Sequence, residues 1–148
     1  MKKQLYIELI KEISALIEGT NEAISNYANV SAAIFNKLPD INWAGFYFLH
    51  GNALILGPFQ GKPACVKIPI GKGVCGTAIQ ENKTLIVADV HCFPGHIACD
   101  NASRSEIVIP LIKDGIKLAV LDVDSPIPDR FDELDKEYLE KIVSIINT

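Results

Sequence analysis

The sequence predicts an α+β protein, in which helices at both ends of the chain flank a central antiparallel sheet. Two amphipathic segments precede the first strand, the strands are mostly joined as hairpins, and a further amphipathic segment ends the chain. This order differs from the alternating strand and helix pattern of doubly wound folds. Because the chain has 148 residues, 49% of them hydrophobic, we expect one domain over residues 1–148.

Two helices are predicted before the first strand. Residues 2–18 carry apolar side chains at helical spacing up to Gly19, on a face formed by Leu5, Leu9, Ile13, Leu16 and Ile17. Residues 22–37 repeat this spacing until Pro39, with a face formed by Ala23, Ile24, Tyr27, Val30, Ile34 and Leu38. Charged residues interrupt the first apolar run, so we interpret it as a helix of a cytoplasmic protein and not as a signal peptide.

The central segments alternate between strands and turns. Strands are predicted at 43–49 and 53–57 around a turn at 50–52, then at 65–70 and 84–89, with a short helix at 74–81 between them. A long loop follows at 90–104. A second hairpin, 106–112 with 116–124, surrounds Lys113, Asp114 and Gly115, and a helix runs from Asp132, its expected cap, to Ile146, with an apolar face of Leu134, Tyr138, Ile142 and Ile145.

Charge and motif content exclude several classes of function. The net charge is −4, and basic residues do not gather near aromatic ones, so we expect neither nucleic acid nor a membrane surface as a partner. No glycine-rich dinucleotide fingerprint or Walker-type loop occurs in the sequence. We therefore expect no nucleotide cofactor.

Four cysteines fall within 35 residues of the chain: Cys65, Cys75, Cys92 and Cys99. A disulfide framework is disfavoured because no export signal is present. Zinc bound by Cys92, His96 and Cys99 is an alternative, although no C-x2-C pair occurs. The cysteines can also act as small buried hydrophobic residues, or carry redox chemistry, which needs an exposed thiolate and a second thiol within reach.

Two of the cysteines have local sequences that suit a thiolate. Cys99 lies among small and polar residues, where Arg104 favours the thiolate and Asp100 opposes it. Cys75 follows Gly-Lys-Gly in the first turn of the predicted short helix, where free backbone N–H groups favour negative charge.

The second hairpin carries three acids in an otherwise apolar context. Asp122 and Asp124 are two apart on one strand and so share a face. A two-residue turn would place Glu106 on the other face, whereas a three-residue turn would pair it with Asp122, and we expect the latter. The acids are either solvated strand ends or a pocket for an ammonium group with a carboxyl that holds a proton. Trp43 and Tyr47, four apart on their strand, can form an aromatic wall there or belong to the core.

Four segments resemble the free methionine-(R)-sulfoxide reductases, GAF-domain enzymes that act on the free amino acid: NWAGFYFL, GPFQGKPACVKIPIGKGVCGTA, DVHCFPGHIACDNASRSEIVIPL and LAVLDVDSP. The resemblance covers residues 40 to 145, and the two preceding helices also agree with it. It implies an antiparallel sheet of about six strands, with the terminal helices on one face and the pocket on the other. It also implies a homodimer that is recycled by thioredoxin and binds no cofactor or metal.

The resemblance also implies roles for individual residues. Cys99 corresponds to the nucleophile, Cys65 to the main resolving cysteine and Cys75 to a third family cysteine, while Cys92 has no counterpart in that pattern. Glu106, Asp122 and Asp124 correspond to the pocket acids, with Glu106 or Asp124 as proton donor, and Trp43 and Tyr47 to the aromatic wall.

The implied chemistry is reduction of the sulfoxide by Cys99, with a sulfenic acid that Cys65 converts to a disulfide. Two competing hypotheses stay open: a GAF-type sensor of small molecules or redox state without turnover, and a zinc protein that uses Cys92, His96 and Cys99.

Overall fold

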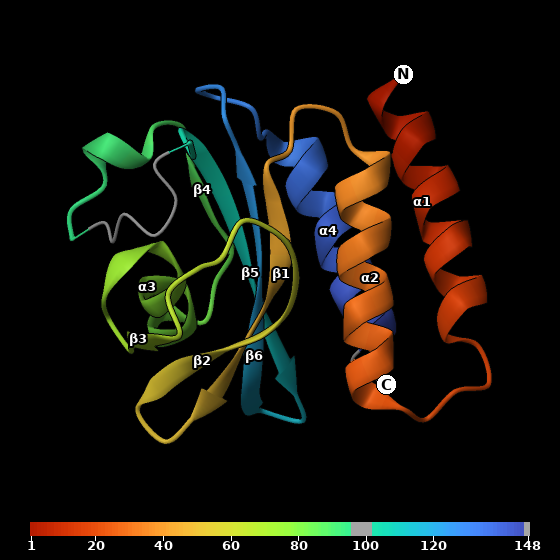
Figure 1. Cartoon of the computed structure of the whole chain (residues 1–148), viewed down its shortest axis with the longest axis horizontal. Helices are drawn as coiled ribbons and strands as arrows, with labels where there is room; N and C mark the ends of the chain where they lie inside the picture. Colours follow the sequence, from red (N-terminus) through yellow and green to blue (C-terminus); the bar gives the residue numbers. More distant parts are fainter. Residues whose placement is uncertain (96–101, 147–148) are drawn as a thin grey trace.

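The computed structural model describes residues 1–95 and 102–146. Six strands form one antiparallel sheet in the order β3-β2-β1-β6-β5-β4 (Figure 1). They are β1 (Trp43–His50), β2 (Ala53–Gly61), β3 (Lys67–Pro69), β4 (Leu85–Val87), β5 (Ser105–Lys113) and β6 (Ile116–Ser125). The helices are α1 (Lys2–Ile17), α2 (Ala23–Lys37), α3 (Gly73–Glu81), the short 3-10 helix η1 (Val90–Cys92) and α4 (Glu133–Ile146). The α+β class is confirmed.

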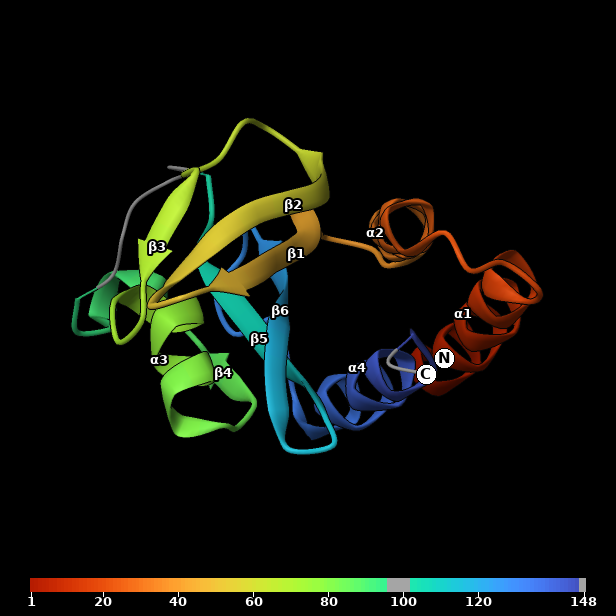
Figure 2. The same cartoon turned by 90° about the horizontal axis from the view of Figure 1, so that it is seen from below.

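The sheet separates two hydrophobic cores. Helices α1, α2 and α4 cover one face, whereas α3 and η1 lie on the other side (Figure 1 and Figure 2). The first core packs the terminal helices against residues such as Phe46 and Leu121. The second contains Trp43, Tyr47 and Cys75. Alternation of side chains along β1 therefore sends Phe46 to the helices and its neighbour Tyr47 to the opposite face.

The predicted helices are present, but two of their apolar faces are wrong in part. On α1 the buried residues are Tyr6, Leu9 and Ile13, while Leu16 is 42% exposed. On α2, Ile24 is 72% exposed because it lies about 100° around the helix from the centre of the buried face. The apolar face predicted from the spacing did not include Tyr6. The Tyr6 side chain is buried, and its hydroxyl donates a hydrogen bond to Asp135 on α4.

Three strands differ by three residues or more from their predicted lengths, among them β4, which is limited to Leu85–Val87 although a strand was predicted over 84–89. Strand β2 continues to Gly61, four residues beyond the predicted end, because β1 pairs with it along its whole length across a bulge between Gly45 and Tyr47. Strand β3 is limited to Lys67–Pro69, although a strand was predicted over 65–70. Cys65 thus lies in the connection between β2 and β3 and not on a strand.

The turn of the second hairpin was predicted wrongly, yet Glu106 still lies on the expected face. The loop contains only Asp114 and Gly115, both with positive φ, and Lys113 pairs with Ile116. A register shift between Leu111 and Ile112 then adds one residue on β6. Because one extra residue reverses which face a strand presents, this bulge cancels the effect of the short turn.

Helix α4 begins with a cap at Asp132, as expected. The Oδ1 atom of Asp132 accepts hydrogen bonds from the backbone N–H groups of Leu134 and Asp135, at 3.0 and 3.1 Å. The side chain thereby satisfies two N–H groups that have no partner within the helix. Within the described part of the chain, no helix is both long and apolar enough to span a membrane.

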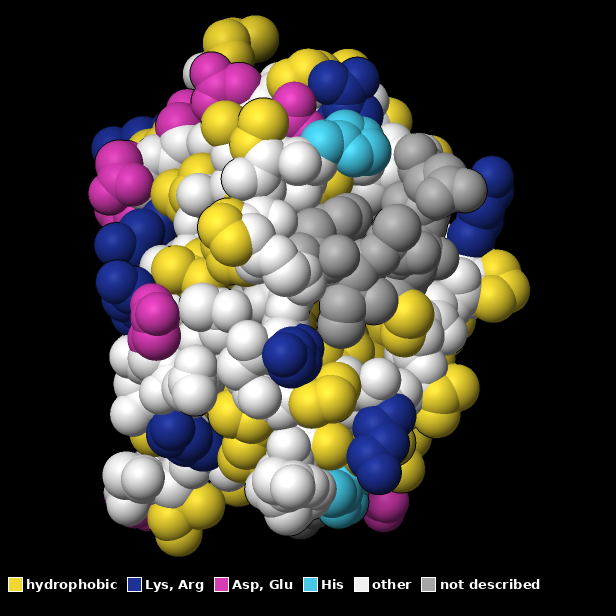
Figure 3. All heavy atoms as spheres, turned by 90° about the vertical axis from the view of Figure 1, so that its left-hand side faces the viewer, with side chains coloured by type: hydrophobic (Ala, Val, Ile, Leu, Met, Phe, Trp, Pro, Cys, Tyr) yellow, Lys and Arg dark blue, Asp and Glu magenta, His cyan; other side chains and the backbone are white. Residues whose placement is uncertain are grey.

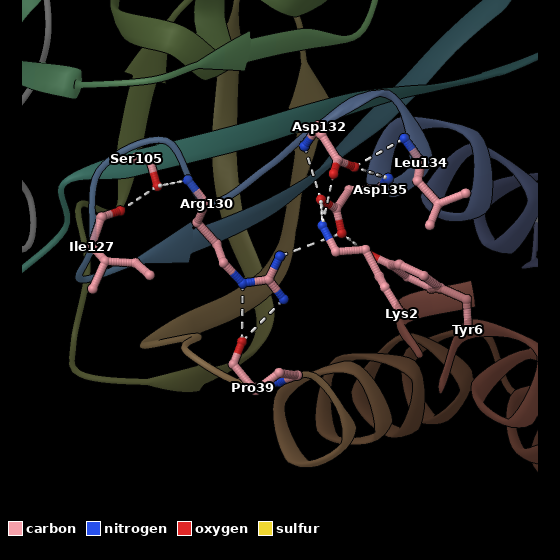
Figure 4. A network of polar contacts seen from close by, with 9 residues as sticks. All are labelled: Lys2, Tyr6, Pro39, Ser105, Ile127, Arg130, Asp132, Leu134 and Asp135. Carbon is pink, nitrogen blue, oxygen red and sulfur yellow. Dashed lines mark hydrogen bonds and ion pairs between the residues drawn. The ribbon is translucent and has the colours of Figure 1, made fainter. Parts of the chain in front are cut away.

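A polar network around Asp135 joins α4 to the N-terminal helix (Figure 4). The Asp135 carboxylate is fully buried and accepts hydrogen bonds from Tyr6 Oη at 2.6 Å and Lys2 Nζ at 2.8 Å. Arg130 Nη1 lies 3.4 Å from the same carboxylate, and its Nε and Nη2 atoms donate to the Pro39 carbonyl. Burial, followed by the charge of Asp135, raises the pKa of Tyr6, so this hydroxyl stays a donor at neutral pH.

Asp135→Asn is expected to lower the free energy of unfolding by about 3 kcal/mol, because it leaves buried cationic and hydroxyl donors without their charged acceptor. The measurement is urea unfolding at neutral pH. Lys2→Gln is the matched control, since Lys2 is partly exposed and its loss should cost at most about 1 kcal/mol. If the two variants were equally stable, Asp135 would not be the centre of this network.

Candidate active site

Three buried carboxylates lie together on the sheet face opposite the terminal helices. Glu106 on β5 pairs with Asp124 on β6. Asp122 lies two residues before Asp124 on the same strand, so its side chain is on the same face. We call Glu106, Asp122 and Asp124 the acid cluster. All three residues are buried, which excludes the alternative of solvated strand-end acids.

Burial and mutual repulsion favour a proton within the acid cluster. The pKa of Asp122 lies well above its ordinary value, chiefly because the carboxyl is buried, and then because Asp124 and Glu106 carry charge beside it. Asp122 is therefore the carboxyl of the acid cluster on which burial and the neighbouring acids favour a proton. The arrangement can therefore offer both negative charge to a cation and an acidic proton at neutral pH.

Cys75 contacts the acid cluster from α3. Its Sγ atom lies 3.8 Å from Glu106 Oε2, in the position of a hydrogen-bond donor. Burial raises the pKa of the Cys75 thiol, and the charges of Asp122 and Glu106 raise it further. The expectation that the first turn of this helix would favour a thiolate is thus wrong, because burial, followed by the charges of the acids, outweighs the helix N–H groups.

Three stacked aromatic rings form a wall beside the acids. Trp43 pairs with Asp124 across β1 and β6, and its ring stacks on Tyr47 and Phe59 at centroid distances of 5.9 and 5.1 Å. We call Trp43, Tyr47 and Phe59 the aromatic wall. The sequence analysis did not include Phe59, because the strand that contains it was predicted to end at residue 57. Gly45 allows this packing, since a Cβ atom there would lie 2.3 Å from Phe59 Cβ.

The aromatic wall also holds the segment that contains Cys65. Tyr47 Oη donates to the Cys65 carbonyl at 2.9 Å, and Trp43 Nε1 donates to the Lys62 carbonyl at 3.0 Å. The sulfur of Cys65 takes part in a disulfide, whereas Cys75 and Cys92 are free thiols. Cys65 is therefore anchored through its backbone to residues that line the site.

Cys99 and His96 lie outside the described residues, so the zinc arrangement with Cys92 is not described either. The residues on either side of positions 96–101 form backbone hydrogen bonds with elements of the site. Gly73, at the start of α3, donates its N–H to the Gly95 carbonyl at 3.1 Å, and Arg104 donates its N–H to the Ser125 carbonyl at 2.8 Å. The Arg104 side chain forms an ion pair with Asp89, at 3.5 Å. Figure 3 shows this side of the molecule, where basic side chains lie in several separate places.

Comparison with known proteins identifies the fold and the relatives. The GAF domain family matches residues 12–148. The free methionine-R-sulfoxide reductase of Escherichia coli is 48% identical over 143 residues, which is 97% of this chain and 87% of the relative.

Two solved structures are similar over nearly the full length. The free methionine-R-sulfoxide reductase of Neisseria meningitidis in complex with its substrate is 40% identical, with a TM-score of 0.96 over 99% of this chain and 89% of that one. The reduced form of fRMsr of Staphylococcus aureus is 58% identical, with a TM-score of 0.93 over 96% and 92%. With a GAF domain over residues 12–148 and these relatives at 40 to 58% identity over nearly its full length, this chain belongs to the family of the free methionine-R-sulfoxide reductases.

Proposed function

We propose that this protein reduces free L-methionine-(R)-sulfoxide to methionine. The observation that carries the proposal is the acid cluster, buried beside the aromatic wall, in a chain that shares 48% of its residues with a reductase of that name. Three acids buried on an apolar sheet repel one another unless a cation or protons accompany them. The substrate carries an ammonium group, and its reduction consumes protons.

The acid cluster has two tasks in this proposal. Its ionised carboxylates bind the ammonium group of the amino acid, and Trp43 packs on the S-methyl group. The proton that the cluster holds, most favourably at Asp122, passes through Glu106 or Asp124 to the sulfoxide oxygen. Protonation makes the oxygen a better leaving group when the sulfur is attacked.

The cysteines carry the electrons in two steps. The Cys99 thiolate attacks the sulfoxide sulfur and forms a sulfur–sulfur bond. The S–O bond then breaks as the protonated oxygen transfers to Cys99 Sγ, and the sulfur–sulfur bond breaks, which releases methionine and leaves a sulfenic acid on Cys99. The Cys65 thiol then attacks that sulfenic acid, so a disulfide forms and water departs. Thioredoxin supplies two electrons and two protons to restore both thiols. The position of Cys65 beside Tyr47, and the raised pKa of Cys75, support Cys65 as the resolving cysteine.

The proposal extends to selectivity for the free amino acid. We propose that the loop over 90–104 closes on the substrate, so that a peptide-bound methionine sulfoxide is excluded by its flanking peptide bonds. We also propose a cytoplasmic homodimer that needs no bound cofactor.

The test is a turnover assay coupled to thioredoxin and its reductase, read as oxidation of reduced nicotinamide cofactor. We expect turnover with free L-methionine-(R)-sulfoxide. The kcat/KM should be at least about 100-fold lower with the (S)-sulfoxide, or with a methionine-(R)-sulfoxide whose amino group is acetylated and whose carboxyl group is amidated. A folded protein that binds the free sulfoxide without turnover would instead support a sensor. Equal rates on the peptide would contradict the enclosed site.

A further inference from the structure

Cys75 and two members of the acid cluster bring together three possible metal ligands. One donor atom each from Cys75, Glu106 and Asp122 lies within 4.8 Å of the others, and all three side chains are buried. They come from α3, β5 and β6, so the tertiary structure, and not a local sequence motif, brings them together.

The spacing of these atoms is close to that of ligands on one zinc ion. With Zn–S bonds of about 2.3 Å and Zn–O bonds of about 2.1 Å, two tetrahedral ligands lie roughly 3.5 Å apart. Cys75 Sγ and Glu106 Oε2 are 3.8 Å apart. Small side-chain movements would therefore place both atoms on one ion.

A second observation at the same place is a buried acceptor that no donor of the described residues satisfies. Asp122 is only 6% exposed, and its Oδ1 atom is buried without a hydrogen-bond partner among the described residues. A buried carboxylate oxygen without a donor costs free energy. A cation bound between the carboxylates would remove this cost, and it would also screen the repulsion among the acids.

We propose that the protein, with Cys75 as a free thiol, binds one Zn²⁺ ion through Cys75 Sγ and the carboxylates of Glu106 and Asp122. The thiolate selects zinc or a softer divalent ion over Mg²⁺ and Ca²⁺, which prefer oxygen ligands only. The thiol releases its proton when the ion binds, because the positive charge of the ion stabilises the thiolate against its burial and against the nearby acids. Water completes the fourth position.

The consequence for turnover rests on the proposed function. Zinc and the ammonium group of the substrate would use the same carboxylates, so the metal would inhibit competitively and a chelator would restore activity. Binding itself does not depend on the reaction, and its test needs no substrate.

The experiment uses a variant in which Cys75 is the only thiol, with Cys65, Cys92 and Cys99 replaced by serine. Titration with Co²⁺ or Cd²⁺ should produce the thiolate-to-metal charge-transfer absorption at one equivalent, and Zn²⁺ should displace the probe. Adding Cys75→Ser should abolish the absorption, and adding Glu106→Gln or Asp122→Asn should raise the Kd at least tenfold. Asp89→Asn, which changes an acid outside this trio, should leave the Kd unchanged.

A folded variant, verified by circular dichroism, that gives no thiolate absorption at millimolar Cd²⁺ overturns the proposal. Equal affinity before and after Asp122→Asn does so too. If the triple serine variant does not fold, the oxidised form of Cys92→Ser offers the same measurement, because Cys65 is then in its disulfide and Cys75 stays free. A protein that reduces the sulfoxide yet binds no metal would contradict only this inference and leave the proposed function intact.

Discussion

Replacing Cys99 with serine should lower kcat/KM for free L-methionine-(R)-sulfoxide by about 10⁴-fold or more. A serine hydroxyl ionises far above neutral pH, and its oxygen is a poor nucleophile toward sulfur, so neither methionine nor the sulfenic acid forms. The thioredoxin-coupled assay measures the loss of turnover, and chromatography of free methionine confirms it without the coupling enzymes.

Cys65→Ser and Cys92→Ser show whether the loss of turnover is specific to Cys99. Cys65→Ser should release one methionine per protein in a single turnover and then stop with thioredoxin as reductant, because no disulfide can form. Cys92→Ser should retain the wild-type rate, since the Cys92 side chain is exposed at the end of η1 and outside the acid cluster. Undiminished steady-state turnover by Cys99→Ser would show that another residue attacks the sulfoxide.

Asp122→Asn should lower kcat/KM by on the order of 10²- to 10⁴-fold and at the same time stabilise the protein by about 1 kcal/mol at neutral pH. The amide cannot hold the proton of the acid cluster or attract an ammonium group. It also removes a buried carboxyl that Asp124 and Glu106 repel. Activity and stability should therefore change in opposite directions.

The stability gain should depend on pH in a defined direction. Unfolded aspartate titrates near about 3.9, whereas burial and the neighbouring acids raise the pKa of Asp122 in the folded protein. Between these two values the folded state holds a proton that the unfolded state has lost, so wild-type stability falls as pH rises through this range. Asp122→Asn should remove that slope, as measured by urea unfolding at a series of pH values that begins at about 4, the pKa of an unfolded aspartate, and rises from there.

Asp114→Asn is the matched control for Asp122→Asn. Asp114 lies in the exposed two-residue turn of the same hairpin with a φ of 52°, a conformation that asparagine also adopts readily. This control should keep the wild-type activity and the wild-type pH slope. If Asp122→Asn kept the slope as well, another group would hold the proton of the acid cluster.

The sequence predicted the helices and strands because the patterns that indicate them extend over only a few neighbouring residues. The apolar spacing of α1 and α4, the cap at Asp132 and the turn residues around Gly51 act over a few positions, and each predicted element is present. Likewise, a spacing of two on a strand was enough to place Asp122 and Asp124 on one face. Phe59 and the exact ends of β2 and β3 were missed because strand length depends on the partner strand, which local spacing does not specify.

For the acids and cysteines, the sequence by itself determined which groups are present and which family pattern they follow. Only the tertiary structure decided how they meet. A bulge beside Leu111 returns Glu106 to the face of Asp122 and Asp124, and the packing of α3 brings Cys75 into contact with them. Burial then raises the pKa of the thiol and of Asp122, because distant segments remove water from both. The desolvation of a side chain and the pairing register of two strands both depend on residues that are remote in sequence. No local pattern could therefore specify them.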